Sequence, residues 1–308
     1  MSEPLVSIAL CTYNGEQFLA KQLDSLLAQS YTEIEVVAVD DRSSDKTWEI
    51  LNDYAAKDKR LRINLNENNL GHSANFEKAI KLCKGDYIAV ADQDDIWEKD
   101  KIALMMGYAE SHIMVYHDSD FIDEQDKRIG NQTLASKNRM YDGDSCLPVI
   151  LANSIHGHTM LFDSKLKNYI FPFKAEVSHD WVIAFAAFNI GKVKYLDKVL
   201  VHYRQHQNSV TDILEQKEKA GDKNKGAGLR RLPVNANWLH YCLEFKNKRD
   251  EALVDKACLL FLNLLDGKDK IPCFFFMMKH FDLLFYNIGY KKRGLFSRIN
   301  YVRKLCFS

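Results

Sequence analysis

The sequence predicts an α/β fold with a mostly parallel sheet, followed by a helical C-terminal extension. In the first third of the chain, short β-branched runs alternate with amphipathic stretches, which is the pattern of βαβ units. Three of the predicted strands end in polar loops. Beyond residue 228 only helical patterns appear. A chain of 308 residues, 46% of them hydrophobic, can bury a sizeable core of this kind.

The predicted elements follow from the hydrophobic periodicity of each stretch. Strands are expected at residues 5–11, 34–40, 61–65, 86–91, 113–118, 156–162 and 193–203. Helices are expected at residues 16–29, around 48–54, around 76–83, at 99–110 and at 179–189. We also expect a hairpin at residues 121–129 and a loop over the ligand-binding edge at 130–144.

Two parts of the chain are predicted, an α/β domain at residues 1–212 and a helical extension at 213–308. Residues 212–228 are charged and contain three glycines, which is typical of a linker. Helical patterns follow at 238–265 and 273–288, and a basic tail begins at residue 289.

The charges cancel overall but are unevenly distributed. The chain has 42 basic and 42 acidic residues, which argues against a nucleic-acid partner. Residues 86–126 carry twelve acids and two bases, whereas residues 289–308 carry six bases and no acid. The neutral average therefore combines an acidic centre with a basic end.

The seven cysteines and the N-terminus bear on the compartment. The cysteines are odd in number and form no C-x-x-C pair, so reduced thiols and a cytoplasmic location are expected. The first residues lack a basic region, and no run of about 18 uncharged apolar residues follows. Secretion and a membrane-spanning segment are therefore not expected.

The strongest chemical signal is Asp92-Gln93-Asp94-Asp95, directly after an apolar strand. Three carboxylates within four residues repel one another, and a divalent cation would relieve that repulsion. Mg²⁺ and Mn²⁺ prefer oxygen ligands and are often completed by substrate phosphates. The alternative is a solvated turn before a helix, whose N-terminus favours acidic residues.

Two further polar loops are expected at the same edge of the sheet, because the carboxyl ends of parallel strands meet there. One contains Asp40 and Asp41 and can accept hydrogen bonds from a ribose or a base. The other is Thr12-Tyr13-Asn14-Gly15, where a helix N-terminus can meet a phosphate or a base. Helix capping explains many loops of this kind equally well.

Taken together, five motifs resemble the bacterial family 2 glycosyltransferases, closest to the rhamnosyltransferase-like branch. They are residues 7–15, 39–45, 69–71, 85–88 and 92–97, in the order that the family has them. The resemblance covers residues 4–210. It implies a GT-A fold (a Rossmann-like nucleotide-diphospho-sugar transferase domain), a nucleotide-diphosphate sugar of dTDP or UDP type, a divalent ion (Mg²⁺ or Mn²⁺) and inversion at the anomeric carbon.

The resemblance also implies roles for individual residues. Thr12, Tyr13 and Glu16 would line the nucleotide pocket, with Asp41 toward the base. Asp92 would lie near the ribose and Asp94 on the metal, with Asp40 and Asp95 in support. Arg42 stands where many members have Gly, which is expected to alter the turn without removing the acids.

An inverting transfer needs a general base opposite the leaving diphosphate. The candidate is Asp180 in Ser178-His179-Asp180-Trp181, which resembles the acidic residue that the family has before Trp. The alternative is a helix-capping carboxylate. His179 is expected either to orient this carboxylate, to contact the diphosphate or to pack.

Residues 202–210 match a segment that follows the last strand in this family. Arg204 and His206 are suited to neutralising a leaving diphosphate, and the alternative is a solvated strand end. His156 and His158 are expected beneath the acceptor site without a metal, because no further ligands accompany them.

We therefore predict an inverting, metal-dependent glycosyltransferase of bacterial surface polysaccharide synthesis. Its acceptor is expected to be a glycan or a lipid-linked glycan, and rhamnose is one candidate for the transferred sugar. Aromatic residues in 273–285 and the basic tail favour contact with the inner face of the cell membrane. Packing on the domain or dimerisation is the alternative for this region. The rival functions are a nucleotidyltransferase and a non-catalytic sugar-nucleotide-binding protein. A dehydrogenase is disfavoured because no G-x-G-x-x-G follows the first strand.

Overall fold

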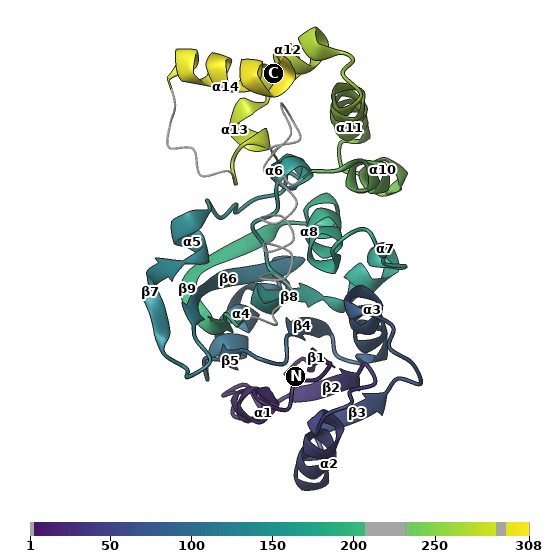
Figure 1. Ribbon diagram of the computed structural model, residues 1–308, viewed down its shortest axis with the longest axis vertical. Helices are drawn as coiled ribbons and strands as arrows, with labels where there is room; N and C mark the ends of the chain where they lie inside the picture. The colour runs from purple at the N-terminus through teal and green to yellow at the C-terminus, as the bar shows by residue number, and fades with distance from the viewer. Residues whose placement is uncertain (1–2, 207–231, 233, 288–293, 308) are drawn as a thin grey trace.

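The computed structural model describes residues 3–206, 232, 234–287 and 294–307 (Figure 1). The predicted linker at 212–228, the end of the 202–210 segment, residue 288 of the predicted helix at 273–288, and residues 289–293 and 308 of the basic tail lie outside these ranges. In Figure 1 the sheet and its first helices occupy one end of the long axis, and helices α11–α14 occupy the other.

Nine strands form one mixed sheet. They are β1 (Val6–Thr12), β2 (Ile34–Asp40), β3 (Leu61–Leu65), β4 (Tyr87–Ala91), β5 (Ile96–Trp97), β6 (Met114–Ile122), β7 (Arg128–Thr133), β8 (Met160–Asp163) and β9 (Val193–Arg204). The order is β3-β2-β1-β4-β8-β6-β9-β5, and β7 pairs with β6. The β3-β2-β1-β4 half is parallel, whereas β8 runs antiparallel to both β4 and β6.

The helices of the α/β part connect these strands. They are α1 (Leu19–Leu27), α2 (Thr47–Lys57), α3 (His72–Leu82), α4 (Lys101–Ala109), α5 (Leu134–Lys137), α6 (Leu147–Leu151), α7 (Lys167–Ile170) and α8 (His179–Ile190), with 3-10 turns at Gly157–Thr159 and Ser164–Leu166. The extension contains α10 (Ala236–Glu244), α11 (Glu251–Leu265), α12 (Lys270–Lys279), α13 (Phe281–Leu284) and α14 (Leu295–Phe307).

The parallel half of the sheet brings three strand ends together. Every residue of β1 and β2 is buried, which matches their continuous apolar runs. The register pairs Thr12 with Asp40, and Leu10 with Ala91. The loops that begin after Thr12, Asp40 and Ala91 therefore meet at one edge.

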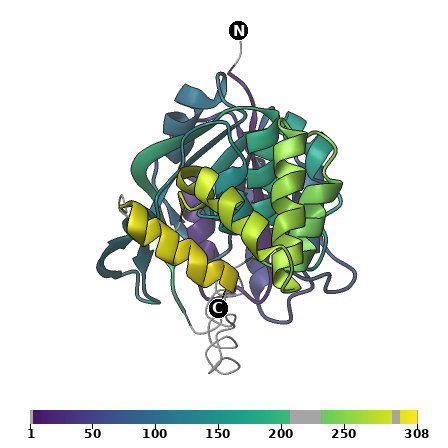
Figure 2. The same ribbon diagram turned by 90° about the horizontal axis from the view of Figure 1, so that it is seen from above.

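The extension packs on helix α8 and shares its core. Residues 182–188 of α8 are completely buried. Trp238 of α10 donates its indole N–H to the carbonyl of Ile150 at 2.9 Å and meets Trp181 and Phe185 edge to face. Seen from above in Figure 2, the green and yellow helices of the extension form one layer over the rest of the chain. The boundary between the two parts, residue 212, stays a prediction.

Several predicted elements differ from the structure. The hairpin is present, but β6 continues to Ile122 and β7 runs from Arg128 to Thr133. The expected loop at 130–144 is wrong as a loop over the site, because its first part is β7 and α5 and none of its residues lines the cavity described below. The predicted helix at 238–265 is two helices, α10 and α11.

Candidate active site

A cavity of about 480 Å³ lies beyond the carboxyl ends of β1, β2 and β4. It is lined by carboxylates and by an unusual number of imidazoles. The carboxylates belong to Asp41, Asp92, Asp94 and Asp180, and the imidazoles to His72, His156, His158, His179 and His206. Thr12 and Tyr13 also line the cavity, whereas Glu16, Asp40, Asp95 and Arg204 do not.

The two acids after β2 organise loops. Asp40 is completely buried and accepts hydrogen bonds from the hydroxyls of Thr12 (2.9 Å) and Ser43 (2.6 Å). Asp41 accepts the side-chain amide of Asn66 and the backbone N–H groups of Leu70 and Gly71, all within 2.8 Å. If Asp41 also contacts the base of a nucleotide, its carboxylate has to do so while it accepts these hydrogen bonds from the loop at 66–71.

Arg42 adopts a left-handed backbone conformation, with φ of 66°. This region favours glycine, which explains why Gly is suited to this position in related proteins. The chain therefore keeps the turn even though Arg42 carries a side chain, and Asp40 and Asp41 keep their positions before it.

Glu16 lies outside the cavity. Its carboxylate accepts the backbone N–H of Lys46 at 2.9 Å, and its own N–H donates to Asp45. These bonds tie the loop after β1 to the start of α2. Glu16 therefore supports the loop and does not face the space in which the resemblance placed it.

Gln93 joins two of the loops. Its side-chain oxygen accepts the N–H of Tyr13 at 2.8 Å, and its side-chain NH₂ donates to the carbonyl of Tyr13 at 3.0 Å. Gly15 leaves room for this arrangement, because a Cβ at position 15 would lie 2.3 Å from the Gln93 oxygen. The amide thus fixes the loop at 92–95 against the loop after β1.

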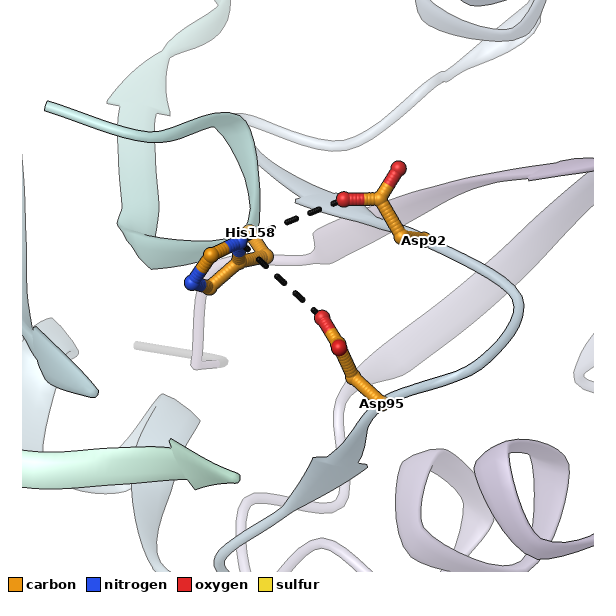
Figure 3. A group of neighbouring side chains, drawn as sticks. All are labelled: Asp92, Asp95 and His158. Atoms are coloured by element: carbon orange, nitrogen blue, oxygen red, sulfur yellow. Dashed lines mark ion pairs between the residues drawn. The ribbon is translucent and has the colours of Figure 1, made fainter. Parts of the chain in front are cut away.

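Asp92, Asp95 and His158 form the group best suited to hold a metal ion among the described residues. Their ligand atoms lie within 4.8 Å of one another. Nδ1 of His158 is 4.0 Å from an oxygen of each carboxylate (Figure 3). Asp95 Oδ2 is buried and has no hydrogen-bond partner in the part of the chain that the structure describes. The two carboxylates supply the oxygen ligands that Mn²⁺ and Mg²⁺ prefer, and the imidazole adds a nitrogen donor of the kind that transition metals take.

Burial and neighbouring charges set the protonation of these groups. Burial, together with the charges of Asp94 and Asp92, raises the pKa of Asp95 well above its usual value. Burial also opposes the ionised form of Asp92, but the nearby His72, whose Nε2 lies 3.9 Å from Oδ1 of Asp92, outweighs burial and lowers the pKa of Asp92. A cation at this site would favour ionised Asp95.

Asp94, from the same loop, also lines the cavity. Its Oδ2 lies 2.8 Å from Nε2 of His206. The ring of His206 packs against Phe18 at a centroid distance of 5.2 Å. Asp94 and His206 thus form a second oxygen and nitrogen pair directed into the same space.

Arg204 does not face the cavity, so it is not placed to neutralise a leaving diphosphate. Its side chain is completely buried over the ring of Phe18 and donates to the carbonyls of Asp94 (2.7 Å) and Asp123 (2.6 Å). It also forms an ion pair with Asp126 at 2.6 Å. A buried guanidinium needs such partners, and it fixes the loop at 92–95 from behind.

Asp180 lies in the first turn of α8 and is half-buried at the cavity wall. Its Oδ1 accepts the backbone N–H of Trp181 at 2.7 Å. This bond orients the carboxylate, as an acid near a helix N-terminus is expected to do. The N-cap of α8 is Ser178, so Asp180 is not the capping residue, and its carboxylate lines the cavity from the first turn.

His179 has a packing environment. Its ring stacks on Phe76 at 4.4 Å, and neither ring nitrogen has a hydrogen-bond partner within the described chain. Burial lowers the pKa of His179 to about 4, so the ring is neutral at physiological pH. It makes no hydrogen bond to Asp180, which favours packing over orientation of that carboxylate.

Sequence reasoning missed three contributors. His158 was expected without a metal, but the 3-10 turn at Gly157–Thr159 brings its ring to Asp92 and Asp95. Lys101 is completely buried, donates to the carbonyl of His158 at 2.6 Å and lies over the ring of Trp97. Its position on the buried face of α4, beside Ile102 and Met105, could have indicated that Lys101 is buried. Gln93, which joins two of the loops, is the third contributor that the sequence did not predict.

The sequence profile described as Glycosyl transferase family 2 matches residues 7–170, more than half of the chain. The chain belongs to this family. Among relatives of this glycosyltransferase, an uncharacterized glycosyltransferase of Haemophilus influenzae is 28% identical over 70% of this chain and 71% of its own. An Escherichia coli relative, "UDP-Glc:alpha-D-GlcNAc-diphosphoundecaprenol beta-1,3-glucosyltransferase WfaP", is 29% identical over 67% of this chain and 80% of its own.

Solved structures show the same GT-A fold. Staphylococcus aureus TarS, crystallised with UDP-GlcNAc, covers 91% of this chain and 81% of its own, with a TM-score of 0.59 at 18% identity. The mannosyltransferase PcManGT of Pyrobaculum calidifontis, in complex with GDP-Man and Mn²⁺, covers 87% of this chain and 72% of its own, with a TM-score of 0.55 at 14% identity. At these identities the likeness bears on the fold alone.

Proposed function

We propose that this glycosyltransferase moves a sugar from a nucleotide-diphosphate donor, with inversion, to a glycan or lipid-linked acceptor in bacterial surface polysaccharide synthesis. The observation that supports this most strongly is that the carboxylates of Asp92, Asp94 and Asp180 line one cavity at the carboxyl edge of the sheet. The name of the E. coli relative, a glucosyltransferase acting on a diphosphoundecaprenol-linked sugar, supports the acceptor class.

Inversion follows from a single displacement. The acceptor oxygen bonds to the anomeric carbon while the bond from that carbon to the diphosphate oxygen breaks, and the diphosphate leaves with the bonding electron pair. Asp180 takes the proton of the acceptor hydroxyl, since it is the cavity carboxylate oriented from α8. Its bond to Trp181 restricts the carboxylate to one orientation.

A divalent ion, Mg²⁺ or Mn²⁺, would be held by the acids of the 92–95 loop. Asp94 with His206, and Asp92 and Asp95 with His158, are the groups that offer oxygen and nitrogen donors there. When bound, the ion supplies Lewis-acid stabilisation of the charge on the leaving diphosphate. Arg204 contributes by holding the loop that carries Asp94.

We infer a donor of dTDP or UDP type, bound by Thr12, Tyr13, Asp41 and Asp92 at the cavity wall. A UDP-sugar is the type present in the TarS complex and in the name of the E. coli relative, so it takes precedence over a dTDP-rhamnose donor. A cytoplasmic location with contact at the inner membrane face is part of the proposal. None of the helices within the described ranges is long and apolar enough to span a bilayer.

The donor can be tested directly by thermal denaturation of the purified chain with a panel of nucleotide sugars, each with and without Mn²⁺. We expect one sugar nucleotide to raise the melting temperature, and Mn²⁺ to enlarge that shift, because a ligand bound only to the native state stabilises it. Asp94→Ala should lose the Mn²⁺ effect, whereas the exposed Asp53→Ala should keep it. A panel without any Mn²⁺-dependent shift would contradict the proposal.

A further inference from the structure

The most exposed large hydrophobic side chains of the extension lie on two of its helices, and Leu259 of α11 is a further one at 52%. Among the described residues, the four most exposed ones are Ile271 (62%), Phe275 (66%), Leu295 (63%) and Phe296 (87%). The first two belong to α12 and the other two to α14. Phe307, at the end of α14, is also exposed. Isolated exposed apolar residues are common, but such a concentration on adjoining helices indicates a contact surface.

The two helices pack against each other, with the C-terminal end of α14 beside α12. Phe274 contacts the ring of Phe307 at a centroid distance of 6.2 Å and the ring of Phe275 at 5.5 Å. Sγ of Cys306 lies 3.9 Å from Sδ of Met277 on the buried side of the same pair. One face of the pair thus packs inward. The other face carries an aromatic row, Phe275, Phe274 and Phe307, in which Phe275 and Phe307 are exposed to solvent.

Basic side chains border the exposed aromatic row. Exposed lysines and arginines on and next to the two helices are Lys268, Lys270, Lys279, Arg303 and Lys304. The exposed acids nearby are Asp266, Asp269 and Asp282, and Asp282 is paired with Arg298. The region is therefore basic as well as apolar.

We infer that this aromatic-basic face, formed by the exposed residues of α12 and α14 just named, docks on an anionic lipid surface. Exposed Phe, Leu and Ile side chains can enter the acyl boundary, and flanking Lys and Arg are attracted to anionic headgroups. In Figure 1 both helices lie at one end of the long axis, and in Figure 2 no drawn helix or strand lies over them. The face can therefore meet a plane without moving other elements.

The charge of the face argues against a second copy as its occupant. Two copies joined through this face would bring like charges together, with few acids to pair them. An anionic membrane has the complementary sign. The docking inference concerns a surface that the proposed transfer reaction does not use. It rests on the proposed function in one respect only, namely that docking would bring the enzyme to a lipid-anchored acceptor.

Vesicle sedimentation of the full chain tests the inference. Wild-type protein should sediment with vesicles of mixed phosphatidylcholine and phosphatidylglycerol, and more weakly with phosphatidylcholine alone. Phe275→Ser combined with Phe296→Ser should weaken binding to the mixed vesicles about tenfold or more, because each ring loses its apolar transfer energy. Lys270→Ser with Arg303→Ser should reduce the preference for phosphatidylglycerol, because two of the five exposed bases are lost.

Matched controls separate this result from misfolding and from the proposed function. Tyr108→Ser with Ile129→Ser removes two exposed apolar side chains away from the face and should leave vesicle binding unchanged. All variants should keep the wild-type melting temperature and nucleotide-sugar shift. Equal sedimentation of the double Phe variant and the wild type would overturn the inference while leaving the transfer proposal standing. Concentration-dependent self-association lost in that variant would assign the face to a second copy instead.

Discussion

At the residue scale, the proposed chemistry depends most on one carboxylate, that of Asp180. Asp180→Asn keeps the size and the bond to the Trp181 N–H but cannot accept the acceptor proton. We expect turnover to fall by about 10²–10⁴-fold, while the thermal shift with the donor is retained. Glu176→Gln, an exposed change shortly before α8, is the control and should keep full turnover. Near-normal turnover of Asp180→Asn would remove Asp180 from this role.

Gln93 offers a test of how the loops are positioned. Gln93→Ala removes both hydrogen bonds to Tyr13, and we expect kcat/KM to fall by about 10-fold to 100-fold through displaced binding groups. Gly15→Ala should give a similar loss, since its Cβ would occupy the space of the Gln93 oxygen.

The two changes should not add when combined, because each disrupts the same contact. Steady-state kinetics of both single variants and the double variant check this expectation. Gln125→Ala, an exposed glutamine, is the control. Fully additive losses would show that Gly15 and Gln93 act independently.

At the scale of elements, Asp41 connects β2 to the loop that begins α3. Asp41→Ala would leave the N–H groups of Leu70 and Gly71 without their acceptor, which we expect to cost about 1–3 kcal/mol of unfolding free energy. Urea denaturation measures it. The exposed Asp53→Ala should change stability by less than about 0.5 kcal/mol. A stability loss no larger than that of the control would contradict the structural role of Asp41.

Glu35 links strands β1, β2 and β3 and gives a pH-dependent contribution. Burial opposes its ionised form, but the hydroxyl of Ser7, the N–H of Lys84 and the guanidinium of Arg62 outweigh burial and lower the pKa of Glu35. Because the folded-state pKa is lowered, this stability is complete above the ordinary Glu pKa and is lost as pH falls through the folded value.

Glu35→Gln should therefore be less stable than the wild type at neutral pH, and its free energy of unfolding should fall less when the pH is lowered. Urea denaturation at neutral pH and at about pH 3 compares the two proteins. Glu33→Gln, which is exposed, should follow the wild type. Parallel pH dependence of wild type and Glu35→Gln would contradict the account.

The elements that sequence predicts well are those with strong periodicity. β1 and β2 are buried on both faces, so their apolar runs mark them, and the helix at 179–189 is confirmed as α8 within one residue. β5 has two residues and forms only by pairing with β9, so no local pattern indicates it. The helical periodicity at 238–265 continues across the break between α10 and α11.

At the scale of the whole molecule, the fold class and the edge that carries the site follow from the sequence. Polar loops after parallel strands meet at one edge for geometric reasons, and Asp92, Asp94 and Asp180 all reach the same cavity. The contribution of His158 could not be predicted, because a 3-10 turn distant in sequence positions it. Arg204 was expected at the leaving diphosphate because of its charge and its place after the last strand. Its burial depends on contacts with Asp94, Asp123 and Asp126, which no local pattern shows.

The acidic centre and the basic end of the sequence occupy different parts of the molecule. The acidic stretch supplies the cavity loop at 92–95, and the basic residues of α14 lie in the helical layer over α8. The chain therefore separates the groups proposed to act on the donor from the face inferred to meet lipid. Transfer and docking should respond to different substitutions.

The most direct test of the central claim is the release of nucleoside diphosphate from the stabilising sugar nucleotide, on addition of a lipid-linked glycan acceptor. Wild-type protein should release nucleoside diphosphate with Mn²⁺ or Mg²⁺ and stop when EDTA removes the ion, and Asp94→Ala and Asp180→Asn should release almost none. Acceptor-dependent release that persists in EDTA or in Asp180→Asn would contradict the claim that an ion on the 92–95 loop and a base on α8 carry the transfer.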